Sequence, residues 1–394
     1  MGPRVLALTS SGVGHLFPMV PTLWAARGAG ASVVVGASGP AVGAAAQAGL
    51  PAVDLAPGGR DDLAAIRASF LRRMPGATDD RERFGIAMAM FAAQAHRVAD
   101  SAVALGRAVR PDVVVHTPLQ AAGPLVAAVL GVPAIEHGFQ LTGVGRTRDL
   151  LAPHLAGACA RHGVPDLAPT AAALDVCPPS MHPGGPIGRS LGLRPYSGGR
   201  VLDDRLLSSV LDRPRARPRV LVTVGTTDDH ATALPAVLSA LADRDAEVLL
   251  AGDLPDSCPD PTHGARIVAQ GWLPLDTVLG GVDALVHHGG AGSALAALAH
   301  GVPQVVVSGH ADHAFNAAAL VRRGAGASAA PADPVAAPEP AALDAALAAV
   351  LDDPAIAATA REVAAEMAAL PGPAEVVGPL LAEFTTRPVI QEAA

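Results

Sequence analysis

Short runs of β-branched and aliphatic residues alternate with alanine-rich stretches along the whole chain. In the first half, runs typical of buried strands cover residues 4–8, 32–35, 112–115 and 133–136. A second series covers residues 218–224, 246–251, 265–269, 284–287 and 304–307. Alanine favours helices, so the stretches between the runs are expected to be helical. Strands that alternate with helices indicate parallel sheets, and the restart of the pattern predicts an α/β fold of two doubly wound domains.

A segment of different composition separates the two series. Residues 177–218 are rich in proline, glycine and arginine, which is typical of a connection between domains. The 394 residues also exceed the roughly 250 that one hydrophobic core usually serves. We therefore expect an N-terminal domain over residues 1–200, a linker over 201–217 and a C-terminal domain over 218–376.

Residues 60–107 have the pattern of long helices. Methionine and phenylalanine recur there at helical spacing, which fits either core packing or an apolar wall for a bulky ligand, since methionine adapts to irregular shapes. The methionines and phenylalanines of this segment are Phe70, Met74, Phe84, Met88, Met90 and Phe91.

Composition and charge exclude several classes of protein. Half of the residues are hydrophobic and the net charge is only -8, so the chain is not disordered. All 28 basic residues are arginines and none form a run, which argues against nucleic acid as a partner. Three widely spaced cysteines favour a reducing cytoplasm over a disulfide framework. The apolar stretch 113–135 is interrupted by prolines and glycines, so it predicts a strand, a helix and a strand rather than a membrane span.

The clearest candidate for chemistry is a glycine-rich turn between a predicted strand and a predicted helix. It contains Gly289, Gly290 and Gly292 and leaves backbone N–H groups at a helix N-terminus, which suits a phosphate. Ser293 adds a hydroxyl and His288 a ring N–H. A tight turn with nothing bound is the alternative, but the histidines at its mouth favour phosphate binding. We call residues 287–293 the phosphate turn, after this expected role.

Three further loops are expected at the same edge of the second sheet, where ligands bind in open α/β folds. Asp312 either accepts hydrogen bonds from sugar hydroxyls or caps a helix, and His313 follows it. Trp272 either stacks on a nucleobase or packs under its loop. Gly225 and Thr226 end the first strand of the second half.

The first half has one loop of interest, residues 10–18, between the opening strand and a helix. Gly12 and Gly14 resemble a dinucleotide-binding fingerprint, but its third glycine falls at Phe17, so the fingerprint fails. His15 remains, in a place suited to a general base that faces the other domain.

Together these motifs resemble an inverting, nucleotide-sugar-dependent glycosyltransferase of the GT-B fold, in the family 1 branch that decorates actinomycete natural products. The resemblance covers almost the whole chain. It rests on Gly14-His15-x-x-Pro18, the segment 219–226, Gly271-Trp272-x-Pro274, His287-His288-Gly289-Gly290-x-Gly292-Ser293, Gly301-Val302-Pro303 and Asp312-x-x-x-Asn316. Residues 371–377 resemble the final segment of the family, which implies a C-terminal helix over 377–394 that crosses back to the N-terminal domain.

The resemblance implies roles for individual residues. His15 is the base that deprotonates the acceptor, and Asp312 and His313 face the donor sugar. The nucleotide and diphosphate site consists of Gly225, Thr226, Trp272, Leu273, His288, Gly289, Gly290, Ala291, Gly292 and Ser293. The apolar acceptor, an aromatic or macrocyclic aglycone, is expected against Phe70, Met74, Phe84, Met88, Phe91 and Phe139.

Three positions depart from the pattern of the family. Thr117 stands where many relatives have an acid that orients the histidine. Ala296 stands where UDP-sugar enzymes often have a glutamate for the ribose, which favours a dTDP-sugar over a UDP-sugar as donor. His313 stands where glutamine is frequent in enzymes that use fully hydroxylated hexoses, which favours a deoxysugar.

We expect no metal and no cofactor besides the nucleotide sugar, which is a co-substrate. Asp243 and Asp245 form the one Asp-x-Asp, far in sequence from the phosphate turn, and the histidines at 287, 288, 310 and 313 match no zinc spacing. The expected location is cytoplasmic, without an integral membrane segment, and a homodimer is left open. Two alternatives also stay open: a nucleotide-sugar epimerase, and an auxiliary protein of the same fold, which Thr117 slightly favours.

Overall fold

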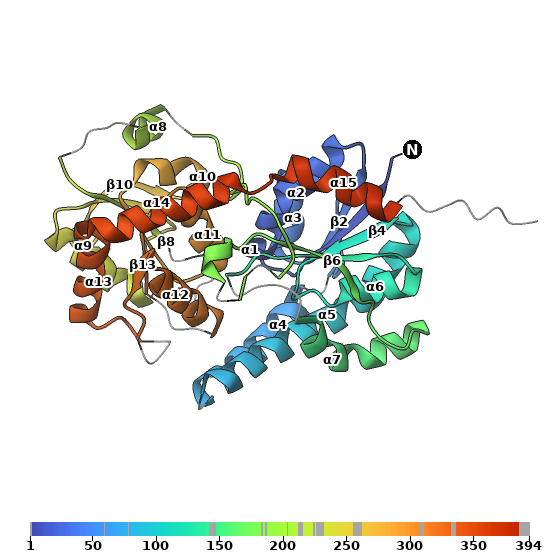
Figure 1. The fold of residues 1–394 in the computed structure, drawn as a ribbon. Coiled ribbons are helices and arrows are strands. Elements are labelled where there is room, and N and C mark those ends of the chain that lie inside the picture. The colour runs from blue at the N-terminus through green and yellow to red at the C-terminus, as the bar shows by residue number, and fades with distance from the viewer. Residues whose placement is uncertain are drawn as a thin grey trace, which may run out of the picture.

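Each half of the chain forms one parallel β-sheet covered by helices (Figure 1). The computed structural model describes residues 2–58, 60–77, 79–141, 147–182, 184–185, 187–202, 204–211, 216–223, 225, 232–254, 262–307, 311–331 and 336–385. Within these residues the first sheet has the strand order β3-β2-β1-β4-β5-β6-β7 and the second the order β10-β9-β8-β11-β12-β13. The predicted class, two α/β domains with doubly wound parallel sheets, is confirmed.

The strands of the first sheet lie within residues 4–190. They are β1 (Arg4–Leu8), β2 (Ser32–Ala37), β3 (Ala52–Asp54), β4 (Val113–His116), β5 (Ala134–His137), β6 (Thr170–Asp175) and β7 (Arg189–Ser190). The helices that accompany them are α1 (Val13–Leu16), α2 (Val20–Gly28), α3 (Pro40–Gln47), α4 (Arg60–Leu71), α5 (Asp80–Val109), α6 (Ala122–Leu130) and α7 (Thr147–His162). The stretch 113–135 therefore forms a strand, a helix and the start of a strand, as predicted.

The second sheet begins at residue 219. Its strands are β8 (Arg219–Thr223), β9 (Glu247–Ala251), β10 (Arg266–Gly271), β11 (Ala284–His287), β12 (Gln304–Val306) and β13 (Gly326–Ser328). Its helices are α9 (Leu234–Asp243), α10 (Leu275–Val278), α11 (Ala291–Ala299), α12 (Ala311–Arg323), α13 (Pro340–Asp352) and α14 (Pro354–Ala369). Short 3-10 turns cover Phe17–Met19 (η1), Met74–Gly76 (η2), Pro179–Met181 (η3) and Leu279–Gly281 (η5).

Between the two sheets the chain forms one further helix, α8 (Asp204–Leu211), inside the segment expected to be a linker. The last described helix, α15 (Pro373–Thr385), follows α14 but packs on the first domain against α2, as Figure 1 shows. Leu380 and Leu381 of α15 are buried in this contact. Among the described residues, none of the helices combines the length and the apolar character needed to cross a bilayer.

The apolar core under α1 and α2 extends from the first domain into the second. Leu16 of α1 and Leu295 of α11 are both fully buried in this cluster. Burial of aliphatic side chains contributes about 1.5–3 kcal/mol for each one. Because α1 follows β1 and α11 follows β11, this shared core brings the loops after those two strands together.

Polar contacts also join the two domains beside η3. The backbone N–H of Ser180 donates to Glu366 Oε1 of α14 at 2.8 Å. Arg322 of α12 donates to the carbonyl oxygen of Met181 at 3.0 Å. The two domains are therefore linked by hydrogen bonds on the side where α14 passes into α15.

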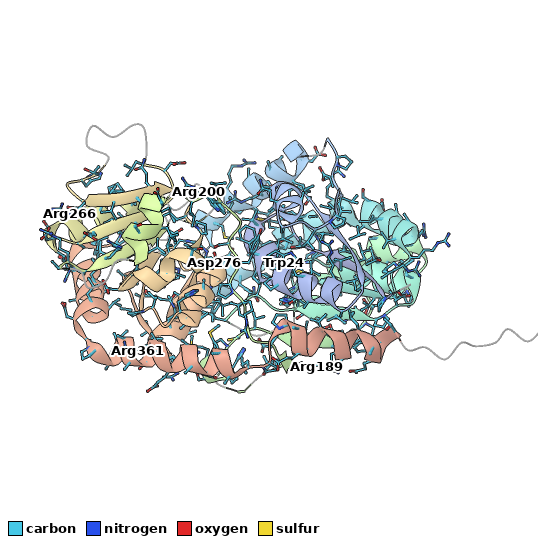
Figure 2. All side chains as sticks on the ribbon, turned by 90° about the horizontal axis from the view of Figure 1, so that it is seen from above. Trp24, Arg189, Arg200, Arg266, Asp276 and Arg361 are labelled. Carbon is cyan, nitrogen blue, oxygen red and sulfur yellow. The ribbon has the colours of Figure 1, made fainter. Side chains whose placement is uncertain are left out.

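A second set of contacts ties residues 197–200 to the second domain. Ser197 Oγ donates to Asp276 Oδ1 at 2.7 Å, and Arg200 donates to the carbonyl oxygen of Trp272 at 2.6 Å. Figure 2 shows Arg200 and Asp276 near the junction of the domains, with Trp24 of the first domain close by. The connecting segment is thus attached to the loop that follows β10.

Four aromatic rings cross this junction in edge-to-face contact. The ring of Tyr196 lies 5.2 Å from that of Trp24 on α2 and 5.3 Å from that of Phe17. The ring of Phe17 in turn lies 6.4 Å from that of Trp272. We call these four residues the aromatic chain. Such ring pairs add about 0.5–1.5 kcal/mol each beyond the area that they bury.

Candidate active site

A cavity of about 680 Å³ lies between the two domains. The loops that line it follow the carboxyl ends of β1, β5, β8, β9, β10 and β11, which is where open α/β sheets bind ligands. His15 lines it from the first domain, and His288, His313 and Trp272 line it from the second. Residues that are far apart in the sequence therefore meet in one site.

The glycine-rich turn after β11 forms the start of α11. Gly290 is the N-cap residue of this helix and makes no side-chain cap hydrogen bond, and it lines the cavity together with residues 291–293. Gly289 has a φ of +98°, a conformation that favours glycine. Asn316 of α12 is buried and donates to the carbonyl oxygen of Gly289 at 2.8 Å, which ties the turn to α12. The first N–H groups of α11 thus open toward the cavity, an arrangement that suits an anion.

His288 occupies a narrow space between two glycines. A Cβ at Gly225, whose φ is +82°, would lie 2.6 Å from His288 Cε1, and a Cβ at Gly290 would overlap His288 Nε2. The ring of His313 lies 5.0 Å from that of His288 in edge-to-face contact. Both histidines line the cavity beside the turn, and an imidazole ring offers N–H groups as hydrogen-bond donors.

Trp272 follows β10 and is 47 % exposed, so the indole does not pack fully under its loop. The neighbouring Leu273 is buried and lines the cavity. Gly198, at a φ of +85°, approaches the indole closely enough that a Cβ would lie 3.4 Å from it. The indole is therefore held at one edge while the rest of it lines the cavity.

His15 lies on α1, across the cavity from the phosphate turn. Its Nδ1 is hydrogen-bonded to the hydroxyl of Ser10, which is buried. Its ring stacks on Phe139 with centroids 4.4 Å apart and lies 5.4 Å from the ring of Phe91 on α5. These contacts fix the orientation of the imidazole.

The comparisons with known proteins agree with this geometry. Residues 24–225 match the N-terminal domain, and residues 235–383 the C-terminal domain, of the family described as erythromycin biosynthesis protein CIII-like. The elloramycin glycosyltransferase ElmGT of Streptomyces olivaceus is 40 % identical over 97 % of this chain and 97 % of its own. The L-demethylnoviosyl transferase of Streptomyces niveus is 35 % identical over 82 % of this chain and 84 % of its own. The chain belongs to this family of glycosyltransferases.

Solved structures of two similar glycosyltransferases have the same fold. SnogD from Streptomyces nogalater gives a TM-score of 0.75 at 31 % identity and covers 97 % of this chain and 100 % of its own. SsfS6 from Streptomyces sp. SF2575, complexed with thymidine diphosphate, gives a TM-score of 0.75 at 29 % identity and covers 96 % of this chain and 99 % of its own. The resemblance to family 1 natural-product glycosyltransferases of the GT-B fold is thereby confirmed. The relatives are transferases, which favours a transferase over the epimerase and the auxiliary protein.

One expected site residue, Thr226, falls outside what the structure describes. His310, of the histidine group that matched no zinc spacing, also lies outside the described residues. Asp312 is the second residue of α12, but its side chain lies outside the description. The predicted contact of Asp312 with the donor sugar therefore stays a prediction.

The six apolar residues expected to bind the acceptor separate into two groups. Phe91 and Phe139 contact His15, and Phe139 also lines the cavity. The other four do not line this cavity and come from α4, η2 and α5, namely Phe70, Met74, Phe84 and Met88. Phe84, 37 % exposed, instead meets Phe315 of α12 across the two domains at 6.4 Å.

Sequence reasoning missed the partner of the glycosyltransferase's His15. Thr117 stands where many relatives have an acid, which left the partner of His15 open, and its hydroxyl is buried without a hydrogen-bond partner in the described part of the chain. Ser10 provides the hydrogen bond instead. The available signal was the position of Ser10, two residues past β1 and five residues before His15.

Three histidines of the enzyme are fully buried and stay neutral. Burial lowers the pKa of His287 to about 3, and its Nδ1 accepts from the backbone N–H of Gly289 at 3.2 Å. Burial also lowers the pKa of His116 and of His137 to about 4. His137 Nε2 accepts from the hydroxyl of Thr22 at 2.8 Å. His287 therefore supports the phosphate turn as a hydrogen-bond acceptor and not as a charge.

In the pair Asp243 and Asp245, considered above as a possible metal site, Asp245 forms a hydrogen bond with an arginine. Asp245, beyond the carboxyl end of α9, accepts from Arg217 Nε at 2.6 Å. Within the described residues there is no group of three or more histidine, cysteine or acidic side chains arranged to hold a metal ion.

Proposed function

We propose that this glycosyltransferase moves a deoxysugar from a dTDP-sugar to a hydroxyl group of an apolar natural-product aglycone, with inversion at the anomeric carbon. The observation that supports this most directly is the single cavity that His15 and the phosphate turn line from opposite domains. In this proposal, residues 1–200 bind the acceptor and residues 218–376 the donor. The linker covers 201–217, and residues 377–394 belong to the C-terminal helix that returns to the acceptor domain.

The proposed mechanism follows from this arrangement. His15 Nε2 takes the proton of the acceptor hydroxyl, whose oxygen attacks the anomeric carbon. The bond to the diphosphate breaks on the opposite face, so the configuration inverts. The N–H groups of residues 291–293, with His288 and Ser293 Oγ, stabilise the negative charge that develops on the diphosphate. Trp272 and Leu273 hold the nucleotide, while Asp312 and His313 face the sugar.

The preference for dTDP rests on Ala296. This residue is buried in α11 and lines the cavity, where its methyl group offers no partner for a ribose 2′-hydroxyl. SsfS6, a similar protein, is complexed with thymidine diphosphate. Titration calorimetry tests this: dTDP is expected to bind more tightly than UDP, and tighter binding of UDP would contradict it.

The acceptor is proposed to be apolar because Phe91 and Phe139 surround the base. The other four residues expected to bind the acceptor, on α4, η2 and α5, are proposed to contact the far end of a large aglycone. They are Phe70, Met74, Phe84 and Met88. A panel of aglycones supplied with dTDP-hexoses tests this class, and a preference for small charged sugars would contradict it.

The role of His15 has its own test. His15→Ala is expected to lower kcat by about 100- to 10,000-fold, because that is the usual contribution of a general base. The affinity for dTDP should stay unchanged, since the nucleotide site lies on the other domain. Full activity of His15→Ala would refute the assignment. A cytoplasmic location and a homodimer are also part of this proposal, and size-exclusion chromatography with light scattering tests the dimer.

A further inference from the structure

The hydrogen bond between Ser10 and His15 places a neutral hydroxyl where a base of this kind usually has a carboxylate. Ser10 is only 4 % exposed and lies between β1 and α1. The same loop is closed by the backbone N–H of His15, which donates to the carbonyl oxygen of Gly12 at 3.1 Å. Serine and histidine are therefore fixed on one short, rigid turn.

The hydrogen bond also selects the form of the imidazole that can act as a base. When Nδ1 carries the hydrogen and donates to Ser10 Oγ, Nε2 has the lone pair that takes a proton. The ring cannot swing away, because Phe139 stacks on it at an interplanar angle of 27° and Phe91 lies against it at 35°. Ser10 thus orients the base without touching the substrate.

A hydroxyl partner differs from a carboxylate in what it does for the charged product. Once Nε2 has taken a proton, the imidazolium carries a full positive charge. A carboxylate on Nδ1 stabilises that charge, as the aspartate of the serine-protease triad stabilises the imidazolium that forms on its histidine. The aromatic faces of Phe91 and Phe139 attract a cation, but they compensate it less than a carboxylate does.

The acidity of the acceptor then decides which hydroxyl groups can react. A phenol ionises near pH 10, whereas an aliphatic hydroxyl is about as weak an acid as water, near 15.7. The proton of an alkyl alcohol is therefore harder to remove than that of a phenol by about 5.7 logarithmic units, whichever base takes it. With a hydroxyl and not a carboxylate on Nδ1, we expect the base to accept the proton of a phenol far more readily.

We propose that Ser10 is the positioning residue of His15, and that this pair restricts the enzyme to acceptors with an aryl hydroxyl group. The inference rests on the proposed function and names the acceptor class of that same site. In the reaction, the aryl O–H proton moves to His15 Nε2 while Nδ1–H stays on Ser10 Oγ. The aryl oxygen forms the glycosidic bond, and dTDP leaves with the electron pair of the bond that breaks. A planar acceptor ring also suits the two phenylalanine faces beside the base.

A matched pair of acceptors tests the restriction. 2-Naphthol and its saturated counterpart decahydro-2-naphthol have the same carbon skeleton but differ in the acidity of the hydroxyl group. With dTDP-hexose donors, we expect a kcat/KM at least 100-fold higher for 2-naphthol, and rates that depend on acidity along a series of substituted phenols. Similar rates with both naphthol compounds would overturn the proposal.

Substitutions at Ser10 test the positioning role. Ser10→Ala is expected to lower kcat for 2-naphthol by about 10- to 100-fold, with KM and the affinity for dTDP unchanged. Ser10→Thr, which keeps the hydroxyl, should restore most of the rate. Ser10→Asp should raise the rate with decahydro-2-naphthol relative to 2-naphthol. The neighbouring Ser11→Ala, a matched control, should behave as wild type.

The outcomes separate this inference from the proposed function. Wild-type kcat in Ser10→Ala, together with an inactive His15→Ala, would overturn the role of Ser10 and leave the transferase proposal intact. An active His15→Ala would refute the assigned base itself. Thermal melting and dTDP binding show which variants are folded. If Ser10→Asp fails to fold, the comparison of kcat between Ser10→Ala and Ser10→Thr still tests the positioning role of Ser10.

Discussion

The position of His288 depends on the absence of a side chain at residue 225. Gly225 has a φ of +82°, and a Cβ built on it lies 2.6 Å from His288 Cε1 and 2.9 Å from both ring nitrogens. Real Cβ atoms do not approach other atoms this closely, so in Gly225→Ala the imidazole must leave its place. The ring cannot shift toward Gly290, because it already fills the space that a Cβ at that residue would occupy.

The expected cost has two parts. A non-glycine residue in the left-handed conformation costs about 1–2 kcal/mol of folding free energy. Loss of the hydrogen bond from His288 to the charged diphosphate costs about 1.5–3 kcal/mol of binding free energy. At about 1.4 kcal/mol for each factor of ten, the affinity for dTDP should fall by about 10- to 150-fold.

Titration calorimetry with dTDP measures this loss, and Gly49→Ala is the control. Gly49 also has a positive φ, +72°, but a Cβ there meets nothing within 4 Å, and the residue lies in the other domain. Gly49→Ala should therefore lower the stability by a similar amount and leave dTDP binding unchanged. Calorimetry of Gly225→Ala combined with His288→Ala should show no further loss beyond His288→Ala alone. Wild-type affinity in Gly225→Ala would refute the reasoning.

Three other predictions concern the nucleotide, pH and the domain contact. Trp272→Leu should weaken dTDP binding by about 1–3 kcal/mol in calorimetry, because a base loses its stacking partner, whereas Trp24→Leu should not. As the pH falls from 6.5 to 4, histidines take up protons in the unfolded chain, whereas His116, His137 and His287 stay neutral in the folded protein. The free energy of unfolding should therefore decrease by about 1.4 kcal/mol per pH unit for each of these three histidines. In His137→Gln, unfolding over this pH range should take up about one proton fewer, so the melting temperature should depend less steeply on pH. Glu366→Ala removes hydrogen bonds to η3 and should lower the melting temperature by a few degrees, at about 0.5–1.5 kcal/mol per bond.

The sequence was sufficient for most of the central strands. Residues 4–8 and 284–287 are β1 and β11 with the predicted limits, because strands buried on both faces read as continuous apolar runs. Pattern reasoning did not find β6, whose sequence Thr170–Asp175 consists largely of alanine and resembles a helix. It also missed α8, since its proline- and glycine-rich surroundings suggested an irregular linker.

The site was predictable where a motif is local and not where side chains from distant elements meet. The glycine-rich turn needs only glycines at the end of a strand, so its place between β11 and α11 followed from residues 287–293, whereas its role toward a phosphate stays a prediction. The contact between Phe91 and His15 depends on how α5 packs beside β1, which no spacing in the sequence specifies. The choice of Ser10 over Thr117 as the partner of His15 depends on side-chain orientation just beyond the ends of the paired strands β1 and β4.

The aromatic chain gives the protein an optical property that its fold alone would not suggest. The sequence contains two tryptophans and one tyrosine, and all three belong to this chain at the junction of the domains. The residues that dominate the near-ultraviolet fluorescence of the protein therefore all lie at the junction of the two domains or in the loop that follows β10. Intrinsic fluorescence of the unlabelled enzyme consequently reports on that junction, so the proposed binding of a nucleotide at Trp272 can be followed in stopped-flow experiments without an added dye.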